Sequence, residues 1–326
     1  MNSKVAIIIV NYKTANLTIE CLRSLSLERV LSSFNVMVVD NDSEDGSFEK
    51  ISAAIVLEEW SDWVSIKASG YNGGFASGNN IAIREFMAAE QVPEYIHLLN
   101  PDTVAREGAV SQLAGFLDTH QAVGIVGSRI EDESNQALLS AFKFQTWLSE
   151  MNKGFSLGVL SRLLKRWVSD EKTPERSIKT DWVSGASMMI RREVFEQIGF
   201  LDEAYFMYFE EMDFCFQANR SGWECWHVPA SRVVHFVGQS SGITNKKMKK
   251  RMPTYWFNSR RRYFLKNFGV THAALADLFW LIGFTSWRAR NMIQCKEDNR
   301  PPGIFKDMLF NSVFFRGTKI KPVKNR

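Results

Sequence analysis

The sequence has little of what marks several common classes of protein. Only four of its 326 residues are cysteine (Cys21, Cys215, Cys225 and Cys295), and they show neither closely paired spacing nor a Cys/His zinc pattern. This excludes a disulfide scaffold and favours reduced thiols in a cytosolic protein. No Gly-x-Gly-x-x-Gly follows the first predicted strand and no P-loop occurs, so the two commonest nucleotide-binding motifs are absent.

Long apolar runs are also missing. The first run, VAIIIV at 5–10, has six residues, which is too short for the hydrophobic segment of a signal peptide and fits a buried first strand. The longest nearly apolar run, 273–287, has 15 residues and includes Asp277, whereas a membrane-spanning helix needs roughly 20. We therefore expect an interfacial amphipathic helix here instead of a span.

Positive charge is concentrated in one part of a chain that otherwise has the composition of an ordinary globular protein. The net charge is only +4, but residues 246–326 hold 19 of the 40 Lys and Arg residues and only four Asp and Glu. This segregation predicts that 246–326 is a helical, basic region facing an anionic membrane surface. Nucleic acid is disfavoured because no recognised module accompanies the charge. The alternatives are a solvated tail, or helices that pack on the rest of the chain or on the partner in a homodimer.

The first 130 residues alternate short apolar runs with helical patterns, which predicts an α/β fold. Runs of this length separated by helices imply right-handed crossovers and a mostly parallel, Rossmann-like sheet with helices on both faces. Ligands are then expected at the carboxyl ends of the strands. Residues 131–180 are less regular and are predicted to be an insertion, and a regular pattern resumes over 181–245. The predicted strands cover 5–10, 34–40, 63–69, 95–100 and 123–130.

Polar residues follow several of these strands. Asn11 ends the first strand and Asp40 the second, so Asp40 is placed to accept hydrogen bonds from a ligand, while Asp42 and Ser43 could instead cap the next helix. In YNGGFASGNN, Gly73 and Gly74 allow close backbone approach to a ligand and Asn79 is expected to open a helix. A loop that needs only positive φ angles explains these glycines equally well.

The turn after the fourth predicted strand holds a candidate metal ligand. In HLLNPDTV, Pro101 fixes the turn so that Asp102 projects beyond the strand. Mg²⁺ or Mn²⁺ bound to a diphosphate is held by one or two carboxylates plus the substrate oxygens. His235 also follows a short apolar strand, which makes it a candidate second ligand. Both residues have a purely structural alternative, a turn residue and a satisfied histidine.

Three carboxylates lie close together in YFMYFEEMDFC. Glu210, Glu211 and Asp213 are surrounded by aromatic residues, and poor solvation raises the pKa of a carboxyl group towards the range suited to a general base. The alternative is the first turn of a helix, where acids interact favourably with the helix dipole.

In this order the chain contains IIIVNYKT, VVDNDSEDGS, NGGFASGNN, LLNPDTV, WVSGASMMIRREVFEQIGFLDEAYFMYFEEMDFC and VVHFVGQSSG, followed by YWFNSRRRYFLKNFG. From residue 4 to about 268 it thereby resembles the inverting family 2 glycosyltransferases of GT-A fold, in particular their rhamnosyltransferase-like branch. The resemblance implies a catalytic domain over 1–245, with a nucleotide-sugar half (1–130) and an acceptor half (181–245).

The resemblance also implies roles for individual residues. Asp40 would contact the pyrimidine base, with Asn11 and Asn72 near the nucleoside, and Gly73, Gly74 and Asn79 of the glycine-rich loop would also belong to the nucleotide-sugar site. Asp102 would be the surviving carboxylate of an Asp-x-Asp metal motif, with Asn100 at its first position and His235 as a further ligand of Mg²⁺ or Mn²⁺. Trp182, Gly185 and Ala186 would line the sugar and acceptor pocket. Glu211 would be the base in place of the usual aspartate, and this departure leaves Glu210 and Asp213 open as alternatives.

The implied reaction is inverting transfer of a sugar, expected to be L-rhamnose from dTDP-rhamnose, to an undecaprenyl-diphosphate-linked saccharide in the synthesis of O-antigen or another surface polysaccharide. The protein would work in the cytoplasm, peripherally on the inner face of a bacterial plasma membrane. A UDP-sugar donor (galactofuranose, hexose or N-acetylhexosamine) is one alternative. A non-catalytic nucleotide-sugar-binding scaffold is the other, supported by the unusual Asn100 and Glu211.

Overall fold

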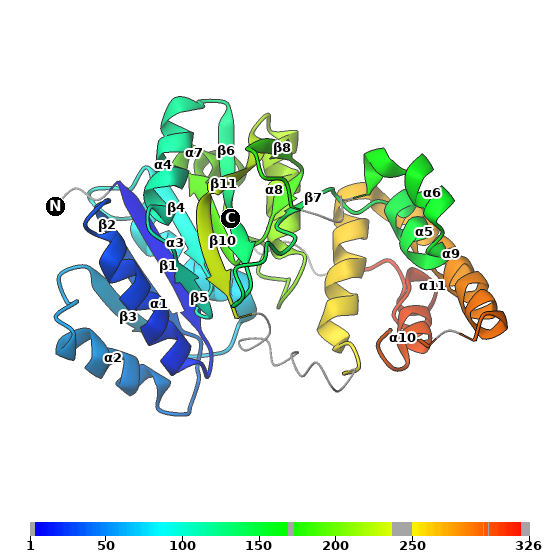
Figure 1. Ribbon diagram of the computed structural model, residues 1–326. Helices are drawn as coiled ribbons and strands as arrows, with labels where there is room; N and C mark the ends of the chain where they lie inside the picture. Colours follow the sequence, from blue (N-terminus) through cyan, green and yellow to red (C-terminus); the bar gives the residue numbers. More distant parts are fainter. Residues whose placement is uncertain (1–3, 169–172, 237–249, 296, 299, 321–326) are drawn as a thin grey trace.

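A nine-stranded mixed sheet forms the centre of the molecule. The computed structural model describes residues 4–168, 173–236, 250–295, 297–298 and 300–320. Within them the strand order is β3-β2-β1-β4-β10-β6-β11-β5, with β8 paired to β11, and β7 and β9 form a separate two-stranded sheet (Figure 1). The strands are β1 Val5–Asn11, β2 Phe34–Asp40, β3 Val64–Ala68, β4 Tyr95–Leu99, β5 Thr103–Ala105, β6 Val123–Glu131, β7 Ala141–Phe142, β8 Ile178–Thr180, β9 Trp182–Val183, β10 Ser187–Arg191 and β11 Glu224–His235.

The first half of this sheet is parallel, as predicted. Strand β1 pairs in parallel with both β2 and β4, and β2 with β3, so the carboxyl ends of four strands meet at one edge. Strand β10 then runs antiparallel between β4 and β6. The five predicted strands correspond to β1, β2, β3, β4 and β6, because four- to seven-residue apolar runs buried on both faces are a local signal.

Helices cover both faces of the sheet, which confirms the predicted fold class. Alternate residues of β1 point to opposite faces: Ile7 and Ile9 pack into one core cluster with α1, α2 and α4, and Ile8 packs into the other with α3, α7 and α8. These helices are α1 Ala15–Glu28, α2 Ser47–Leu57, α3 Gly74–Met87, α4 Ala109–Thr119, α7 Arg192–Ile198 and α8 Glu210–Arg220.

Two local predictions about helix starts are wrong. Helix α3 begins at Gly74, so Asn79 lies in its second turn and does not open it. Helix α2 begins at Ser47, where the Asp45 carboxylate accepts a hydrogen bond from the Ser47 backbone N–H (3.1 Å). Asp42 has a φ of 62° and lies outside the helix.

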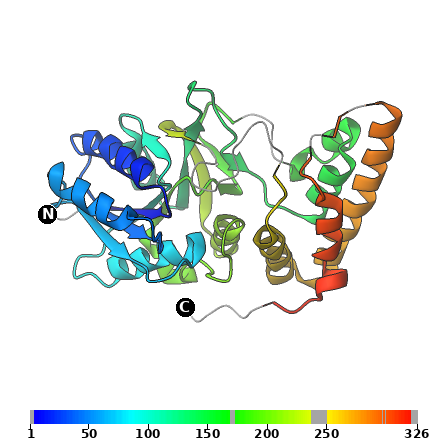
Figure 2. The ribbon, with the colours of Figure 1, turned by 90° about the horizontal axis from the view of Figure 1, so that it is seen from below.

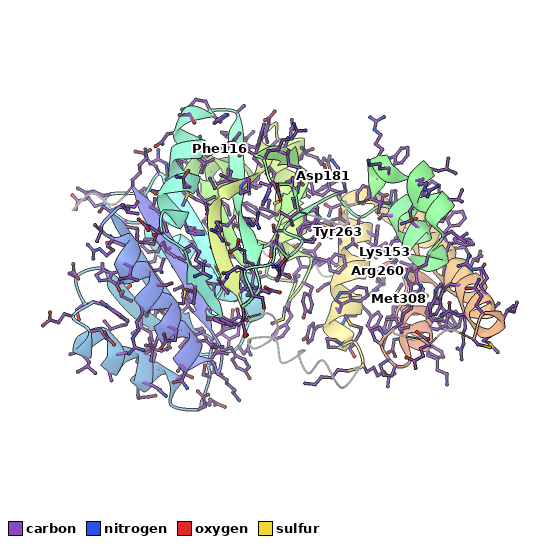
Figure 3. The ribbon with its side chains drawn as sticks, in the orientation of Figure 1. Phe116, Lys153, Asp181, Arg260, Tyr263 and Met308 are labelled. Atoms are coloured by element: carbon purple, nitrogen blue, oxygen red, sulfur yellow. The ribbon has the colours of Figure 1, made fainter. Side chains whose placement is uncertain are left out.

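A second group of helices lies beside the sheet domain, next to α8 (Figures 1 and 2). It combines the segment after residue 250 with the predicted insertion, which supplies α5, α6 and the 3₁₀ helix η1. A buried ion pair joins these two parts of the chain, since the guanidinium of Arg260, which Figure 3 labels on α9, lies 2.8 Å from Glu150. The same guanidinium lies 2.5 Å from Asp277. The helices are α5 Trp147–Phe155, α6 Gly158–Leu163, η1 Lys165–Trp167, α9 Thr254–Ile293, α10 Ile304–Phe310 and α11 Val313–Arg316. The division of the chain at residue 245 stays a prediction.

Helix α9 is long and apolar enough to cross a membrane by length and composition alone, and it is the one such helix in the part of the chain that the structure describes. The sequence-based expectation of no span rested on one shorter run. Within α9 the backbone is interrupted at Gly269 (φ 81°, ψ −179°). The second part of α9 carries the buried carboxylate of Asp277, which pairs back to Arg260 in the first part.

Candidate active site

The ends of β1 and β2 form one polar corner at the carboxyl edge of the sheet. The Asn11 amide donates to Asp40 Oδ1 at 2.6 Å, and the Ser43 hydroxyl donates to the same oxygen at 2.6 Å. The Thr18 hydroxyl in turn donates to Asn11 Oδ1 (2.9 Å). All four side chains are buried. The pairing of Asn11 with Asp40 across neighbouring parallel strands brings together the two residues predicted to lie near the nucleoside.

The glycine-rich loop before α3 lies next to this corner. The Asn41 amide donates to Asn72 Oδ1 (3.0 Å) and to the Gly74 carbonyl (3.2 Å). Gly74 has a φ of 79°, and a Cβ there would stand 1.8 Å from the Phe206 carbonyl oxygen. The Phe75 backbone N–H donates to that same carbonyl (3.0 Å). Gly74 therefore makes room for the loop before α8. This close approach of two backbones brings the corner of Asn11 and Asp40 next to the segment that leads to Glu210 and Glu211.

Asn100, Asp102 and His235 form a second corner. Strand β5 pairs antiparallel with β11, with Thr103 opposite His235, so the histidine lies beside the Asn-Pro-Asp turn. His235 Nε2 lies 3.1 Å from Asp102 Oδ1 and 3.4 Å from the Asn100 amide nitrogen. The Asp102 side chain is fully buried and that of His235 is 16% exposed. The structure thus brings together three residues that are up to 135 positions apart in the sequence.

This corner fits a divalent cation shared with a diphosphate. His235 Nε2 and Asp102 Oδ1 lie 3.1 Å apart, which is close enough for both to bind one cation, and Mg²⁺ and Mn²⁺ commonly take only one or two protein ligands when phosphate oxygens supply others. The described residues contain no group of three or more His, Cys, Asp and Glu side chains that could hold a metal by themselves. Asp102 and His235 would therefore hold the ion jointly with a bound substrate.

Glu210 and Glu211 begin α8 and form the acidic corner. The two preceding residues, Tyr208 and Phe209, have φ angles of 68° and 72°, which is uncommon for bulky side chains and marks a strained turn. Glu210 is buried and Glu211 half-buried. Burial raises the pKa of Glu211 to about 7. Burial raises the pKa of Glu210 well above its usual range, and the charge of Glu211 adds to this.

Neither glutamate has its full set of hydrogen bonds. Glu210 Oε2 and Glu211 Oε2 are buried without a hydrogen-bond partner among the described residues. Buried polar atoms are nearly always paired, so an unpaired carboxylate oxygen calls for an explanation such as a ligand that completes the site. A half-buried carboxyl group with a pKa near neutrality is suited to accept a proton from a substrate hydroxyl.

The segment between β9 and β10 connects the corner of Asn100, Asp102 and His235 with the acidic corner of Glu210 and Glu211. The Ala186 carbonyl accepts a hydrogen bond from the Asn100 backbone N–H (3.0 Å). At the adjacent Gly185, a Cβ would stand 3.7 Å from Glu211 Cβ and 3.3 Å from Phe75 Cζ. Gly185 and Ala186 therefore lie between Glu211 and Asn100, and their place in a sugar and acceptor pocket stays a prediction.

Four other predicted residues have structural contacts. Asp213 accepts hydrogen bonds from Lys266, Asn267 and Tyr205. The Trp182 indole donates to the Lys143 carbonyl (3.1 Å) and stacks on Phe142. Asn79 is buried and donates to the Phe75 carbonyl. Gly73 is packed by its own loop, because a Cβ there would meet Ser77 Cβ at 2.5 Å.

Sequence reasoning missed Asn41 and Ser43. Both lie in the dense polar run after β2, and that run is the signal that could have found them. Ser43 was read as a helix cap, yet its backbone N–H and hydroxyl both hydrogen-bond the Asp40 carboxylate. The positive φ of Asp42 turns the chain so that this contact forms.

A comparison with known protein families identifies the chain. The family described as "Glycosyltransferase like family 2" matches residues 2–254. The chain belongs to glycosyltransferase family 2. The enzyme is thus a glycosyltransferase.

The chain is similar to two curated relatives and to one solved structure. It is 27% identical, over 67% of its length and 71% of the relative, to the N-acetylglucosaminyl-diphospho-decaprenol L-rhamnosyltransferase of Mycobacterium tuberculosis. It is 31% identical, over 68% of its length and 63% of the relative, to the low-salt glycan biosynthesis hexosyltransferase Agl10 of Haloferax volcanii. The mannosyltransferase PcManGT of Pyrobaculum calidifontis, solved with GDP-Man and Mn²⁺, shares the fold with a TM-score of 0.57 at 15% identity, covering 97% of this chain and 83% of that one.

Proposed function

We propose that this glycosyltransferase is a metal-dependent, inverting enzyme that transfers L-rhamnose from dTDP-L-rhamnose to a lipid-diphosphate-linked saccharide. One observation carries the proposal: the pair Glu210 and Glu211, with buried, unpaired Oε2 atoms and raised pKa values, is joined through Gly185 and Ala186 to the Asp102 and His235 corner. The proposed proton acceptor and the proposed diphosphate site would then lie on adjoining segments, which supports direct displacement at C1.

The name of the mycobacterial relative supports rhamnose as the sugar and a polyprenyl diphosphate as the acceptor lipid. In a bacterial enzyme this would place the reaction in the synthesis of O-antigen or a similar surface polysaccharide. The haloarchaeal relative is named more broadly as a hexosyltransferase, which keeps a UDP-sugar donor as the second candidate.

The donor would be bound and oriented by two corners of the site. We call the corner of Asn11, Asp40 and Ser43 the nucleotide corner, and the corner of Asn100, Asp102 and His235 the metal corner. The Asp40 carboxylate, held by Asn11 and Ser43, would accept hydrogen bonds from the nucleotide. Asp102 and His235 would hold Mg²⁺ or Mn²⁺ against the diphosphate, as the Mn²⁺ in the mannosyltransferase complex suggests. When bound, the cation neutralises charge that develops on the leaving diphosphate.

The acidic corner would act on the acceptor. Glu211 accepts the proton of the acceptor hydroxyl, whose oxygen forms a bond to C1 from the face opposite the diphosphate. The bond from C1 to the diphosphate oxygen breaks in the same step and the nucleoside diphosphate leaves, so the anomeric configuration inverts. The pKa of Glu210 is raised well above its usual range by burial and by the charge of Glu211, so Glu210 gives up its proton less readily than Glu211, and Glu211 is the member of the pair assigned as the base.

We further propose that the enzyme works peripherally at the cytoplasmic membrane surface through its helical group. Part of the predicted basic cluster, residues 246–249, lies outside the described residues. The α6–η1 segment, Leu157–Trp167, instead combines large apolar side chains with cations and has no carboxylate. Its exposed apolar residues are Leu157, Val159, Leu163 and Trp167 (38–73% exposed), and its exposed cations are Arg162, Lys165 and Arg166. Such a combination favours an anionic lipid surface.

A donor panel tests the proposed activity. The enzyme would be incubated with dTDP-L-rhamnose, UDP-galactofuranose, UDP-glucose and UDP-N-acetylglucosamine, each with a short-chain polyprenyl-diphosphate N-acetylglucosamine acceptor, with Mn²⁺ or with chelator. The expected result is a metal-dependent product from dTDP-L-rhamnose alone. A product from a UDP-sugar alone would identify the other donor class, and binding without any product would instead favour a scaffold.

A further inference from the structure

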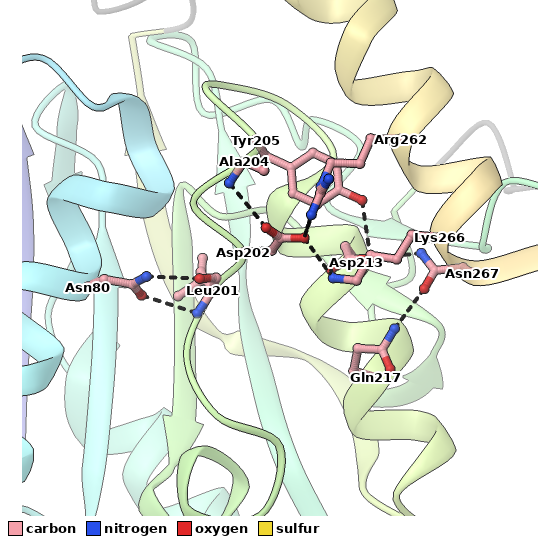
Figure 4. A network of polar contacts seen from close by, with 10 residues as sticks. All are labelled: Asn80, Leu201, Asp202, Ala204, Tyr205, Asp213, Gln217, Arg262, Lys266 and Asn267. Carbon is pink, nitrogen blue, oxygen red and sulfur yellow. Dashed lines mark hydrogen bonds and ion pairs between the residues drawn. The ribbon is translucent and has the colours of Figure 1, made fainter. Parts of the chain in front are cut away.

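Asp213 lies one turn into α8 and belongs to a buried network that reaches helix α9. The Lys266 ammonium lies 2.6 Å from Asp213 Oδ2 and 2.9 Å from Asp202 Oδ2. The Asn267 amide donates to Asp213 Oδ1 at 2.7 Å, and the Tyr205 hydroxyl donates to it at 3.2 Å (Figure 4). Every acceptor oxygen of Asp213 is thus engaged, and a carboxylate held in this way is poorly placed to serve as the base.

The network is sealed from water and charged. The Asp202, Asp213 and Arg262 side chains are 3–5% exposed and that of Lys266 is 14% exposed. Arg262 holds Asp202 independently of Lys266, through two hydrogen bonds of 2.6 and 3.0 Å. Removing one partner of such a buried pair leaves an uncompensated charge, which costs far more than the loss of a surface pair.

The catalytic acids stand on the same turn as Asp213. The Asp213 backbone N–H donates to the Phe209 carbonyl at 2.8 Å, and this bond spans Glu210 and Glu211. Residues three apart on a helix are neighbours on its surface, so Asp213 and Glu210 interact. Fixing Asp213 from α9 therefore fixes the turn that presents both glutamates.

We propose that Lys266 is a positioning residue, which holds and neutralises Asp213 from α9 and thereby sets the orientation and the electrostatic environment of Glu210 and Glu211. This rests on the proposed role of Glu211 as the base. It assigns the helical group a function in catalysis, because α9 then completes the acidic corner from outside the sheet domain.

Electrostatics predicts the direction in which changes at Lys266 and Asp213 shift the pKa of the glutamate pair. Burial and the Glu211 charge are the main causes of the raised pKa of Glu210, and Asp213 contributes in the same direction. Without Lys266 the charge of Asp213 is less compensated and disfavours ionisation of the glutamate pair. Without the Asp213 charge the pair ionises more easily. The charged and titratable groups around this turn are Glu210, Glu211 and Asp213 on α8, Asp202 and Tyr205 before it, Arg262, Tyr263 and Lys266 on α9, and Asp181 before β9.

The test is a charge cycle read out as the pH dependence of kcat/KM, with dTDP-L-rhamnose and the synthetic acceptor as substrates. Lys266→Met should move the acidic limb of the profile of kcat/KM against pH to higher pH. Asp213→Asn should move the same limb to lower pH, and each shift should be roughly 0.5–1 pH unit. The double variant should return near the wild-type limb, and Lys266→Arg should keep it. If Lys266→Met does not fold, Lys266→Gln, which keeps a donor without the charge, has the same expected shift.

A merely structural role would lower Tm without moving the limb. The inference would be overturned if Glu211→Gln is inactive but the acidic limb does not move in Lys266→Met and Asp213→Asn. It would also be overturned if the limb moves in the same direction in both variants. Wild-type activity in Glu211→Gln would instead overturn the assignment of the base on which the inference rests. The two failures are therefore distinct.

Discussion

Glu210 and Glu211 combine two costs to stability that a purely structural helix start would avoid. Two bulky residues with positive φ angles precede them, and their own carboxyl groups are buried with unpaired oxygens. Strained backbone and unsatisfied buried acids cluster at functional sites because selection for activity maintains them. The strain observed here is therefore consistent with a catalytic role for this turn.

Replacing Glu211 should stabilise the protein at alkaline pH. Burial raises the folded-state pKa of Glu211 from 4.5 to about 7, so the folded state binds more protons than the unfolded state between these values. The contribution of Glu211 to stability then falls as pH rises through this window. Glu211→Gln should gain Tm relative to wild type at pH 8 compared with pH 5. Glu193→Gln, at an acid in the first turn of α7 whose side chain is 46% exposed, should show no such pH-dependent gain. An equal difference at both pH values would contradict the assignment.

His235 should matter for binding of the metal-bound nucleotide. It lies within 3.1 Å of Asp102 and 3.4 Å of Asn100, and loss of a metal-site residue typically weakens metal affinity by about 10–100-fold. Calorimetric titration of dTDP with Mn²⁺ should show this loss in His235→Ala. The control is His120→Ala, an exposed histidine that stacks on Phe116 at the end of α4. A Kd unchanged in His235→Ala, with and without Mn²⁺, would remove His235 from the metal site.

At the scale of elements, the site depends on a loop-to-loop contact between Gly74 and Phe206. Gly74→Ala forces a side chain into positive φ and to within 1.8 Å of a backbone oxygen, so it should destabilise the fold by more than about 1 kcal/mol. Gly115→Ala is a matched control, because Gly115 lies inside α4 with nothing within 4 Å of its added Cβ. That change should stabilise by about 0.5–1 kcal/mol. Thermal unfolding of both variants measures the contrast, and equal effects would contradict the role of Gly74.

The elements that were predictable from sequence have strong local periodicity. The apolar runs of β1, β2 and β4 are buried on both faces and gave their strands to within a residue at each end. The start of α3 was misplaced because Gly73 and Gly74 disfavour a helix in sequence, so the helix was expected to begin after them. In the structure α3 begins at Gly74, where the backbone lies against the Phe206 carbonyl. Helix α5 was missed because its partner, α9, lies about a hundred residues later in the sequence, and local patterns do not show such contacts. Helix α6 packs on α5 and was missed with it.

The candidate site was predictable only in part, for a similar reason. Asp40 and Asp102 follow buried strands, which is a local signal. The contact of His235 with Asp102 depends on antiparallel pairing of β5 with β11, and the contact of Asp213 with Lys266 depends on the docking of α9. Neither pairing has a local signature, so the three acids at the start of α8 looked alike in sequence although Asp213 has a different role.

At the scale of the whole molecule, the proposal that the helical group contacts a lipid surface can be tested at α6. Val159→Glu with Leu163→Glu places two carboxylates in the exposed apolar face of α6. Because apolar insertion and attraction to anionic lipid are both lost, binding to vesicles containing phosphatidylglycerol should fall at least several-fold in sedimentation assays. The matched control is Val56→Glu with Leu57→Glu, at exposed positions at the end of α2. An equal loss in the control pair, or unchanged binding in the α6 pair, would reject α6 as the membrane contact.

The most direct test of the proposed mechanism is the rate of L-rhamnose transfer by Glu211→Gln in protein shown to be folded and still able to bind dTDP. Loss of a positioned general base should lower this rate by about 10²–10⁴-fold, while Glu193→Gln keeps the wild-type rate. A Glu211→Gln rate within a few-fold of wild type would contradict the assignment of Glu211 as the base, and with it the mechanism that joins the acidic corner to the metal corner.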